Sequence, residues 1–287
     1  MAAALVAAAA LAVVARAEER PRGHLVIIGG GTRGPEIMAR FVELAGGPRA
    51  RVGVFPMASA TPEATGRELA AELGALRLGD VRVLDLTREQ ADTDAALARL
   101  EGVTGVYFAG GDQSRLAAAL RGSRVEARLH RLYADGAVLA GTSAGAAVMS
   151  RVMITGEERR PLSKDDAFQL LEADDVVTGA GFGFVEGAII DQHFVRRRRH
   201  NRLLSLVLEN PRLVGVGIDE ATAICVAPDR TFEVLGEGPV VVYDATGAEV
   251  RRDGDGRGLR ASGLTLHVLR RGARYDLEAR KVLRLGP

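Results

Sequence analysis

A serine flanked by small residues is the feature of this sequence best suited to chemistry. Ser143 lies in the segment Gly141-Thr142-Ser143-Ala144-Gly145, between the apolar runs 137–140 and 146–149. The pattern predicts a strand, a sharp turn and a helix, because a bulky side chain beside such a turn would clash. The turn would project the serine hydroxyl outward and place the N–H of Ala144 where it can bind an oxyanion. The segment predicts a nucleophile, with an ordinary turn as the alternative.

A serine nucleophile needs a base to accept its proton. The chain offers five histidines, which are His24, His130, His193, His200 and His267. The first, second and last suit surface or core positions, because they lie before a predicted strand, in a predicted helix and among C-terminal hairpins. His200 follows four arginines, whose charge disfavours its protonation and makes it a poor base. His193 ends an apolar stretch beside Asp191 and Gln192, so it is the preferred candidate.

An acid should orient the base, and three carboxylates are candidates. Asp219 and Glu220 follow a predicted strand over 214–218, and adjacent side chains of an extended segment face opposite ways, so one of the two can serve. Asp191 lies two residues from His193. Spacing leaves the choice open.

A glycine pair follows another predicted strand, over 105–109. Gly110 and Gly111 would let the backbone approach a substrate carbonyl closely, as a second oxyanion donor must. Asp112 and Gln113 would add polar groups at the edge of the site. An ordinary strand-to-helix turn is the alternative.

A basic run, 196–199, and Arg202 lie just after the candidate base. Arginine pairs with carboxylates through two hydrogen bonds, so arginines beside the nucleophile favour a substrate rich in aspartate. A solvated face is the second interpretation and a nucleic-acid site the third. The net charge of +1 argues against nucleic-acid and membrane partners.

Strands and helices alternate through residue 150, which predicts a parallel sheet with helices on both faces and the site at the carboxyl ends of the strands. Expected strands are 25–28, 51–55, 81–86, 105–109, 185–190 and 214–218, and expected helices are 62–76, 91–100, 114–120, 125–135 and 202–208. Residues 157–175 are charged and polar, and we interpret them as a surface insertion or lid. From about residue 232 short β-rich pieces predict β-hairpins packed on the main sheet.

The two unusual features outside the site are the N-terminus and a single cysteine. Residues 2–14 are almost all apolar and are followed by Ala15 and Ala17, which predicts a cleaved export signal over 1–17. We exclude that segment from the fold. Cys225 has apolar neighbours and is interpreted as a core residue; alone, it excludes an internal disulfide and a cysteine-based metal cluster.

Together, several of these motifs resemble the cyanophycinases, serine peptidases related to the aspartyl dipeptidases called peptidase E. The resemblance covers residues 25–244 and lies in Gly110-Gly111-Asp112-Gln113, Gly141 to Ala146, Asp191-Gln192-His193-Phe194, the arginine pattern Arg197-x-Arg199-x-x-Arg202-Leu203, and the segment Gly217 to Ala223.

The resemblance implies an α/β enzyme with a doubly wound, mostly parallel sheet, like class I glutamine amidotransferases. It implies a homodimer that hydrolyses cyanophycin, a poly-aspartate with arginine on each β-carboxyl, to β-aspartyl-arginine. No metal or cofactor is implied. The implied catalytic residues are Ser143, His193 and Glu220, and the implied substrate-binding residues are Gln113, Asp191, Gln192, Arg197, Arg199 and Arg202. Residues 24–244 would form the catalytic domain and 245–287 a β-rich extension packed on it.

Three departures from the family pattern concern substrate choice. Gly29-Gly30-Gly31-Thr32-Arg33 replaces the acidic residues often found after the first strand of the intracellular enzymes, Arg196 and Arg198 add charge, and 157–175 does not match. An export signal would suit an extracellular or periplasmic enzyme that degrades polymer released by other cells. The alternatives are an α-aspartyl dipeptidase of the peptidase E type and a non-catalytic binding protein on the same fold.

Overall fold

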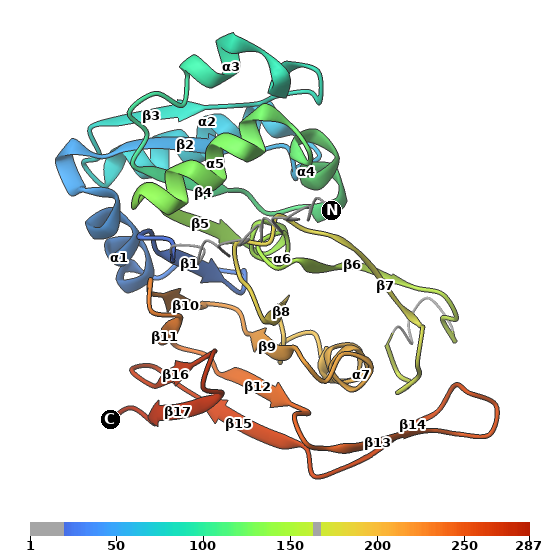
Figure 1. The fold of residues 1–287 in the computed structure, drawn as a ribbon. Coiled ribbons are helices and arrows are strands. Elements are labelled where there is room, and N and C mark those ends of the chain that lie inside the picture. The colour runs from blue at the N-terminus through green and yellow to red at the C-terminus, as the bar shows by residue number, and fades with distance from the viewer. Residues whose placement is uncertain (1–19, 163–167) are drawn as a thin grey trace, which may run out of the picture.

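The computed structural model describes residues 20–162 and 168–287. Within them, nine strands form a central sheet (Figure 1). Five neighbouring strands are parallel, in the order β1 (Leu25–Ile28), β5 (Val138–Thr142), β4 (Gly105–Phe108), β2 (Arg51–Phe55) and β3 (Asp80–Val83). Antiparallel strands continue the sheet beyond β1, namely β10 (Thr222–Val226), β11 (Thr231–Gly236), β16 (Arg274–Asp276) and β17 (Lys281–Arg284). The predicted α/β fold with a large parallel core is confirmed.

Helices cover both faces of the parallel part, as a doubly wound sheet requires. α1 (Pro35–Ala45) and α2 (Pro62–Ala75) bury one apolar stripe each on one face, and both begin with a proline, which suits the first helical turn. The other face carries α3 (Asp94–Ala98), α4 (Gln113–Leu120), α5 (Arg124–Asp135) and α6 (Ala144–Ala147). Side chains of Thr93, Asp112 and Ser123 accept N–H groups at the starts of α3, α4 and α5. Short 3₁₀ turns span Gly47–Arg49 and Gln90–Asp92.

A second sheet, which the sequence did not predict, carries the region around His193. Its order within the described residues is β15 (Thr265–Leu269), β12 (Val240–Asp244), β9 (Val214–Ile218) and β8 (Ala188–Gln192). β8 and β9 are parallel, and α7 (His200–Glu209) packs its apolar face on this sheet. β9 leads directly into β10, so the chain passes from the second sheet to the first at residues 219–221.

Two hairpins project from this framework on the right of Figure 1. β6 (Val152–Glu158) pairs with β7 (Val176–Ala180), and β13 (Glu249–Arg252) pairs with β14 (Leu259–Ser262). The expected lid, 157–175, therefore begins in β6, and residues 163–167 lie outside the described part. Arg160 donates to Glu172 and to the carbonyl of Ala173 across that segment. A closing motion stays a prediction.

The C-terminal strands correct one expectation about packing. They extend the sheets at their edges instead of packing on a face of the main sheet: the hairpin of β16 and β17 adds to the edge of β11, and β15 pairs with β12. The expected strand over 185–190 begins at Ala188, and the helix expected over 91–100 is split into a 3₁₀ turn and α3. The expected export signal over 1–17 lies outside the described residues. No helix of the described part is both long and apolar enough to cross a membrane.

Candidate active site

Ser143 occupies a strained turn at the carboxyl end of β5, directly before α6. Its φ is 54° and its ψ is −111°, a conformation rarely adopted by a residue with a Cβ. Glycine is required on both sides: a Cβ on Gly141 would lie 2.2 Å from the carbonyl oxygen of Gly145, and one on Gly145 would lie 2.3 Å from that of Phe108. The small residues predicted from the sequence thus let strand and helix meet around a half-buried serine.

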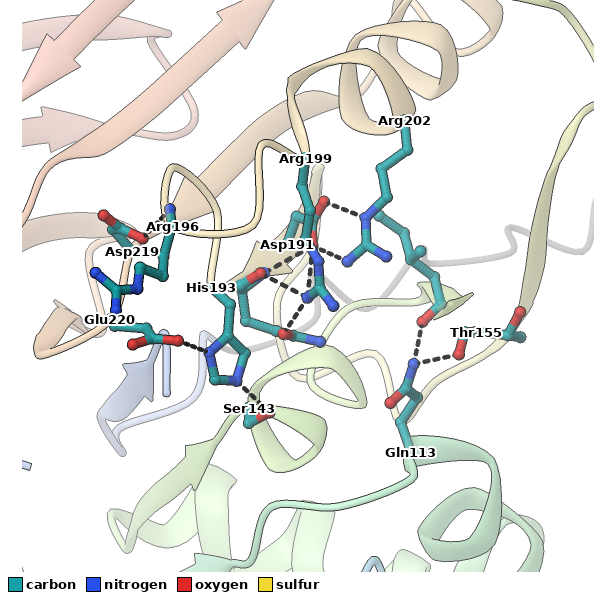
Figure 2. Close-up of polar contacts among 12 residues, drawn as sticks. Gln113, Ser143, Thr155, Asp191, His193, Arg196, Arg199, Arg202, Asp219 and Glu220 are labelled. Atoms are coloured by element: carbon teal, nitrogen blue, oxygen red, sulfur yellow. Dashed lines mark hydrogen bonds and ion pairs between the residues drawn. The ribbon is translucent and has the colours of Figure 1, made fainter. Parts of the chain in front are cut away.

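The structure brings Ser143, His193 and Glu220 together in one chain of hydrogen bonds (Figure 2). Ser143 Oγ lies 2.9 Å from His193 Nε2, and His193 Nδ1 lies 2.6 Å from Glu220 Oε1. His193 directly follows β8 of the second sheet and is 7% exposed. A hydroxyl, an imidazole and a carboxylate in this order can transfer a proton from the serine and stabilise the resulting imidazolium.

The three carboxylates that the sequence offered as the acid beside His193 have different partners in the structure. Asp219 Oδ1 accepts the backbone N–H of Arg196 at 2.9 Å, so this side chain holds the loop after His193. Asp191 is buried and pairs with Arg202. Of the three, Glu220 contacts the imidazole.

The electrostatic surroundings suit a neutral base and an ionised acid. Burial lowers the pKa of His193 below its usual 6.5; the hydrogen bond to Glu220 opposes this, while the charges of Arg197 and Arg199 add to it. The hydrogen bond from His193 holds the pKa of Glu220 below its usual value, and the charges of His193, Arg196 and Arg197 act in the same direction. At neutral pH the imidazole is therefore mostly free to accept a proton.

The expected oxyanion donors lie around Ser143. Ala144 begins α6, and the first N–H groups of a helix have no acceptor within the helix. Gly110 adjoins the serine, since a Cβ there would lie 3.4 Å from Ser143 Cβ. Gly111 has a φ of +138° and packs on the backbone of Ala58, where a Cβ would lie 2.0 Å from the carbonyl oxygen. Their role as donors stays a prediction.

Two of the expected substrate-binding residues are buried and bind each other. Arg202 Nε donates to Asp191 Oδ2 at 2.7 Å, and its Nη2 donates to Asp191 Oδ1. Each residue is 1% exposed. The Arg202 guanidinium also stacks on the ring of Phe168, 4.9 Å from the centroid. The pair therefore joins β8 to α7 and faces no solvent, so any contact with substrate would run through its neighbours.

Arg199 and Gln192 lie between this buried pair and the triad, as Figure 2 shows for Arg199. Arg199 Nη1 donates to the Gln192 backbone carbonyl at 2.7 Å and to its side-chain oxygen at 2.5 Å. The Arg199 side chain is 15% exposed and its Nη1 lies 3.9 Å from Asp191 Oδ1. Burial and the charges of Arg202 and Arg197 lower the pKa of Arg199 to about 10. Arg197 itself is exposed.

Gln113, the remaining expected residue, anchors a strand beside the site. Its amide nitrogen donates to the carbonyls of Ile154 at 2.8 Å and Thr155 at 2.5 Å (Figure 2). No pattern in the sequence indicated these partners or Phe168, because none of them lies in a recognisable motif. The glycines 29–31, which follow the first strand, also border the triad. This run of glycines was noted in the sequence, but nothing there placed it at the catalytic residues.

No metal centre is indicated in the part of the chain that the structure describes, because no three histidine, cysteine or carboxylate side chains there are grouped to hold an ion. Cys225 is buried in β10, as the sequence predicted.

Comparison with known proteins places this geometry in a family. The model of peptidase family S51 matches residues 25–234. A cyanophycinase of Synechococcus elongatus is 33% identical over 271 residues, covering 91% of this chain and 81% of the relative. One of Trichormus variabilis is 34% identical over 279 residues, covering 93% and 90%. A solved peptidase from an acI-B1 Actinobacterium shares the fold, with a TM-score of 0.63, 22% identity and coverage of 90% of this chain and 98% of that one.

Proposed function

This chain belongs to peptidase family S51 and is a peptidase. We propose that it is a serine exopeptidase that degrades cyanophycin to β-aspartyl-arginine. The observation that carries the proposal is the hydrogen-bond chain from Ser143 through His193 to Glu220, with arginines beside it. Its relatives named cyanophycinase supply the substrate class.

The proposed reaction has two halves. Ser143 Oγ attacks the scissile carbonyl while His193 Nε2 takes its proton, and the oxygen of the tetrahedral intermediate accepts N–H groups of Ala144 and the Gly110–Gly111 loop. His193 then protonates the leaving amine, which leaves an acyl-enzyme on Ser143. In the second half, His193 takes a proton from a water molecule while the water oxygen attacks the ester carbonyl. The ester C–O bond then breaks as His193 returns the proton to Ser143 Oγ, which releases the acid and restores the serine.

The arginine cluster would select an acidic main chain. Arg199 is largely buried, and its lowered pKa reflects the cost of holding a cation there beside two others. Asp191 is the carboxylate nearest to it, and that side chain already pairs with Arg202. An incoming substrate carboxylate would restore the charge balance, with Arg197 at the surface as a second contact. Asp112, exposed at the start of α4, would receive the substrate guanidinium.

The experiment incubates protein lacking residues 1–17 with insoluble cyanophycin, and uses the same protein carrying Ser143→Ala as its matched control. We expect mass spectrometry to find β-aspartyl-arginine with the unsubstituted protein alone. Cleavage of α-aspartyl dipeptides in its place would assign the chain to the peptidase E type. Activity on neither substrate would favour a binding protein.

Export is a separate proposal and has its own test. We propose that residues 1–17 are removed during secretion, because an apolar run followed by small residues is typical of a cleaved signal. N-terminal sequencing of protein recovered outside the cytoplasm should begin at Glu18. Recovery of an intact Met1 terminus from the cytoplasm would contradict it. Light scattering of the purified protein would test the expected homodimer.

A further inference from the structure

One short stretch, which comprises the last residue of β1 and the loop 29–31 after it, contacts all three parts of the hydrogen-bond chain. The consecutive backbone carbonyls of residues 28–30 accept three N–H groups, one from each segment of the site. The donors are Ser143 at 3.0 Å, His193 at 2.7 Å and Ala221, which follows Glu220, at 2.9 Å. Backbone hydrogen bonds therefore hold Ser143, His193 and the residue after Glu220 to the same three consecutive residues.

The three donors share an unfavourable backbone conformation. Ser143 has a φ of 54°, His193 of 48° and Ala221 of 54°. Such angles are uncommon for residues with a Cβ, although six other residues of the described part share them, and residues held in them by their surroundings occur at functional sites. The three carbonyl acceptors supply this constraint.

The loop also joins the two sheets. Ser143 follows β5 of the nine-stranded sheet, His193 follows β8 of the four-stranded sheet, and Glu220 lies where the chain passes between them. The hydrogen bond from His193 to the Gly29 carbonyl links the second sheet to the loop after β1. The separation of serine and imidazole thus depends on this contact.

The side chains of the triad pack against the loop as well. A Cβ on Gly30, whose φ is +104°, would lie 2.3 Å from His193 Cε1 and 2.4 Å from its Nε2. A Cβ on Gly31 would lie 3.0 Å from Glu220 Cβ and 3.2 Å from its Oε2. Glycine is needed because the imidazole rests directly on the backbone of Gly30.

We propose that Gly30 and Gly31 are positioning residues, which set the imidazole and the carboxylate in line with Ser143. They touch no reacting atom of the substrate and act through the triad. The inference rests on the roles proposed for Ser143, His193 and Glu220.

The test compares Gly30→Ala with Gly34→Ala, a matched control at the glycine directly before α1. Gly34 has a φ of −58°, and a Cβ there would meet no atom within 4 Å. The readouts are the rate at which diisopropyl fluorophosphate labels Ser143, the kcat on cyanophycin, and the downfield NMR signal of the His193 Nδ1 proton. We expect Gly30→Ala to lower labelling and kcat by about 100-fold and to shift the signal, because small misplacements of reacting groups cost this much. Gly34→Ala should match the unsubstituted protein in all three.

Gly31→Ala keeps the proposal testable if Gly30→Ala fails to fold. Its Cβ would crowd Glu220 and weaken the hydrogen bond that raises the pKa of His193. In the pH profile of the labelling rate, we expect the acidic limb to move to lower pH and the plateau to fall about 10-fold. Folded variants that keep the labelling rate, the pH profile and the proton signal would overturn the proposal. If the unsubstituted protein is neither labelled nor active, the proposed function falls, and the NMR comparison still decides the role of the loop.

Discussion

At the residue scale, two neighbouring carboxylates accept hydrogen bonds from different donors. Glu220 accepts from the His193 ring, whereas Asp219 accepts from the backbone of Arg196. We expect Glu220→Gln to lower kcat by about 10³- to 10⁴-fold, because the wrong histidine tautomer is then favoured. Asp219→Asn keeps an oxygen acceptor and should lose far less. Hydrolysis rates of the two variants at pH 8 measure the difference, and equal losses would contradict the assignment of the acid.

The same histidine gives a pH dependence with a definite sign. Its pKa lies below 6.5, so kcat/KM should reach half its alkaline plateau below that pH. Arg197→Gln removes a positive charge that lowers this pKa, so the midpoint should move upward. Arg131→Gln, on the exposed side of α5, is the control. A midpoint unchanged by Arg197→Gln would show that this charge is screened at the imidazole.

At the scale of elements, one buried ion pair holds α7 to β8. Arg202→Met would leave Asp191 buried without its partner, which typically costs about 3–5 kcal/mol. Arg198→Met, an exposed position four residues earlier, should change stability by no more than about 0.5 kcal/mol. Urea unfolding midpoints of the two variants provide the measurement. Equal midpoints would mean that water or a rearranged side chain compensates the carboxylate.

The elements also show what the sequence could predict. The strand before Ser143 and the helices α2, α4 and α5 follow from apolar periodicity and caps, which are local. Helix α1 was not expected, and a single helix was expected where the 3₁₀ turn and α3 lie. Arg202 was expected at the substrate because arginine pairs with carboxylates and because the resemblance implied it, but it pairs in the core with Asp191, eleven residues before it. Spacing left Asp219 and Glu220 open and the resemblance implied Glu220, which is the carboxylate that contacts His193 across 27 residues of sequence. Contacts between distant segments decided each of these points.

At the scale of the whole molecule, the C-terminal strands belong to the sheets that carry the triad. β15 completes the sheet of β8, which bears His193, and β16 pairs with β11 in the sheet of β5, which bears Ser143. The apolar side chains of Leu269, Tyr275 and Leu277 are buried there, and Tyr275 stacks on Phe232 with centroids 5.4 Å apart. The boundary predicted at residue 244 therefore cuts through both sheets.

A chain ending at residue 244 should consequently be far less stable than the full chain. It would lose three buried side chains worth about 1.5–3 kcal/mol each, a large part of a typical stability of about 5–15 kcal/mol. It would also expose the edges of β11 and β12, which promotes aggregation. Removing residues 281–287 alone, which deletes the mostly exposed β17, should cost much less. Urea unfolding and solubility of the two truncations test this; if the chain ending at 244 unfolds at the midpoint of the full protein, residues 245–287 are an accessory extension and the catalytic unit folds without them.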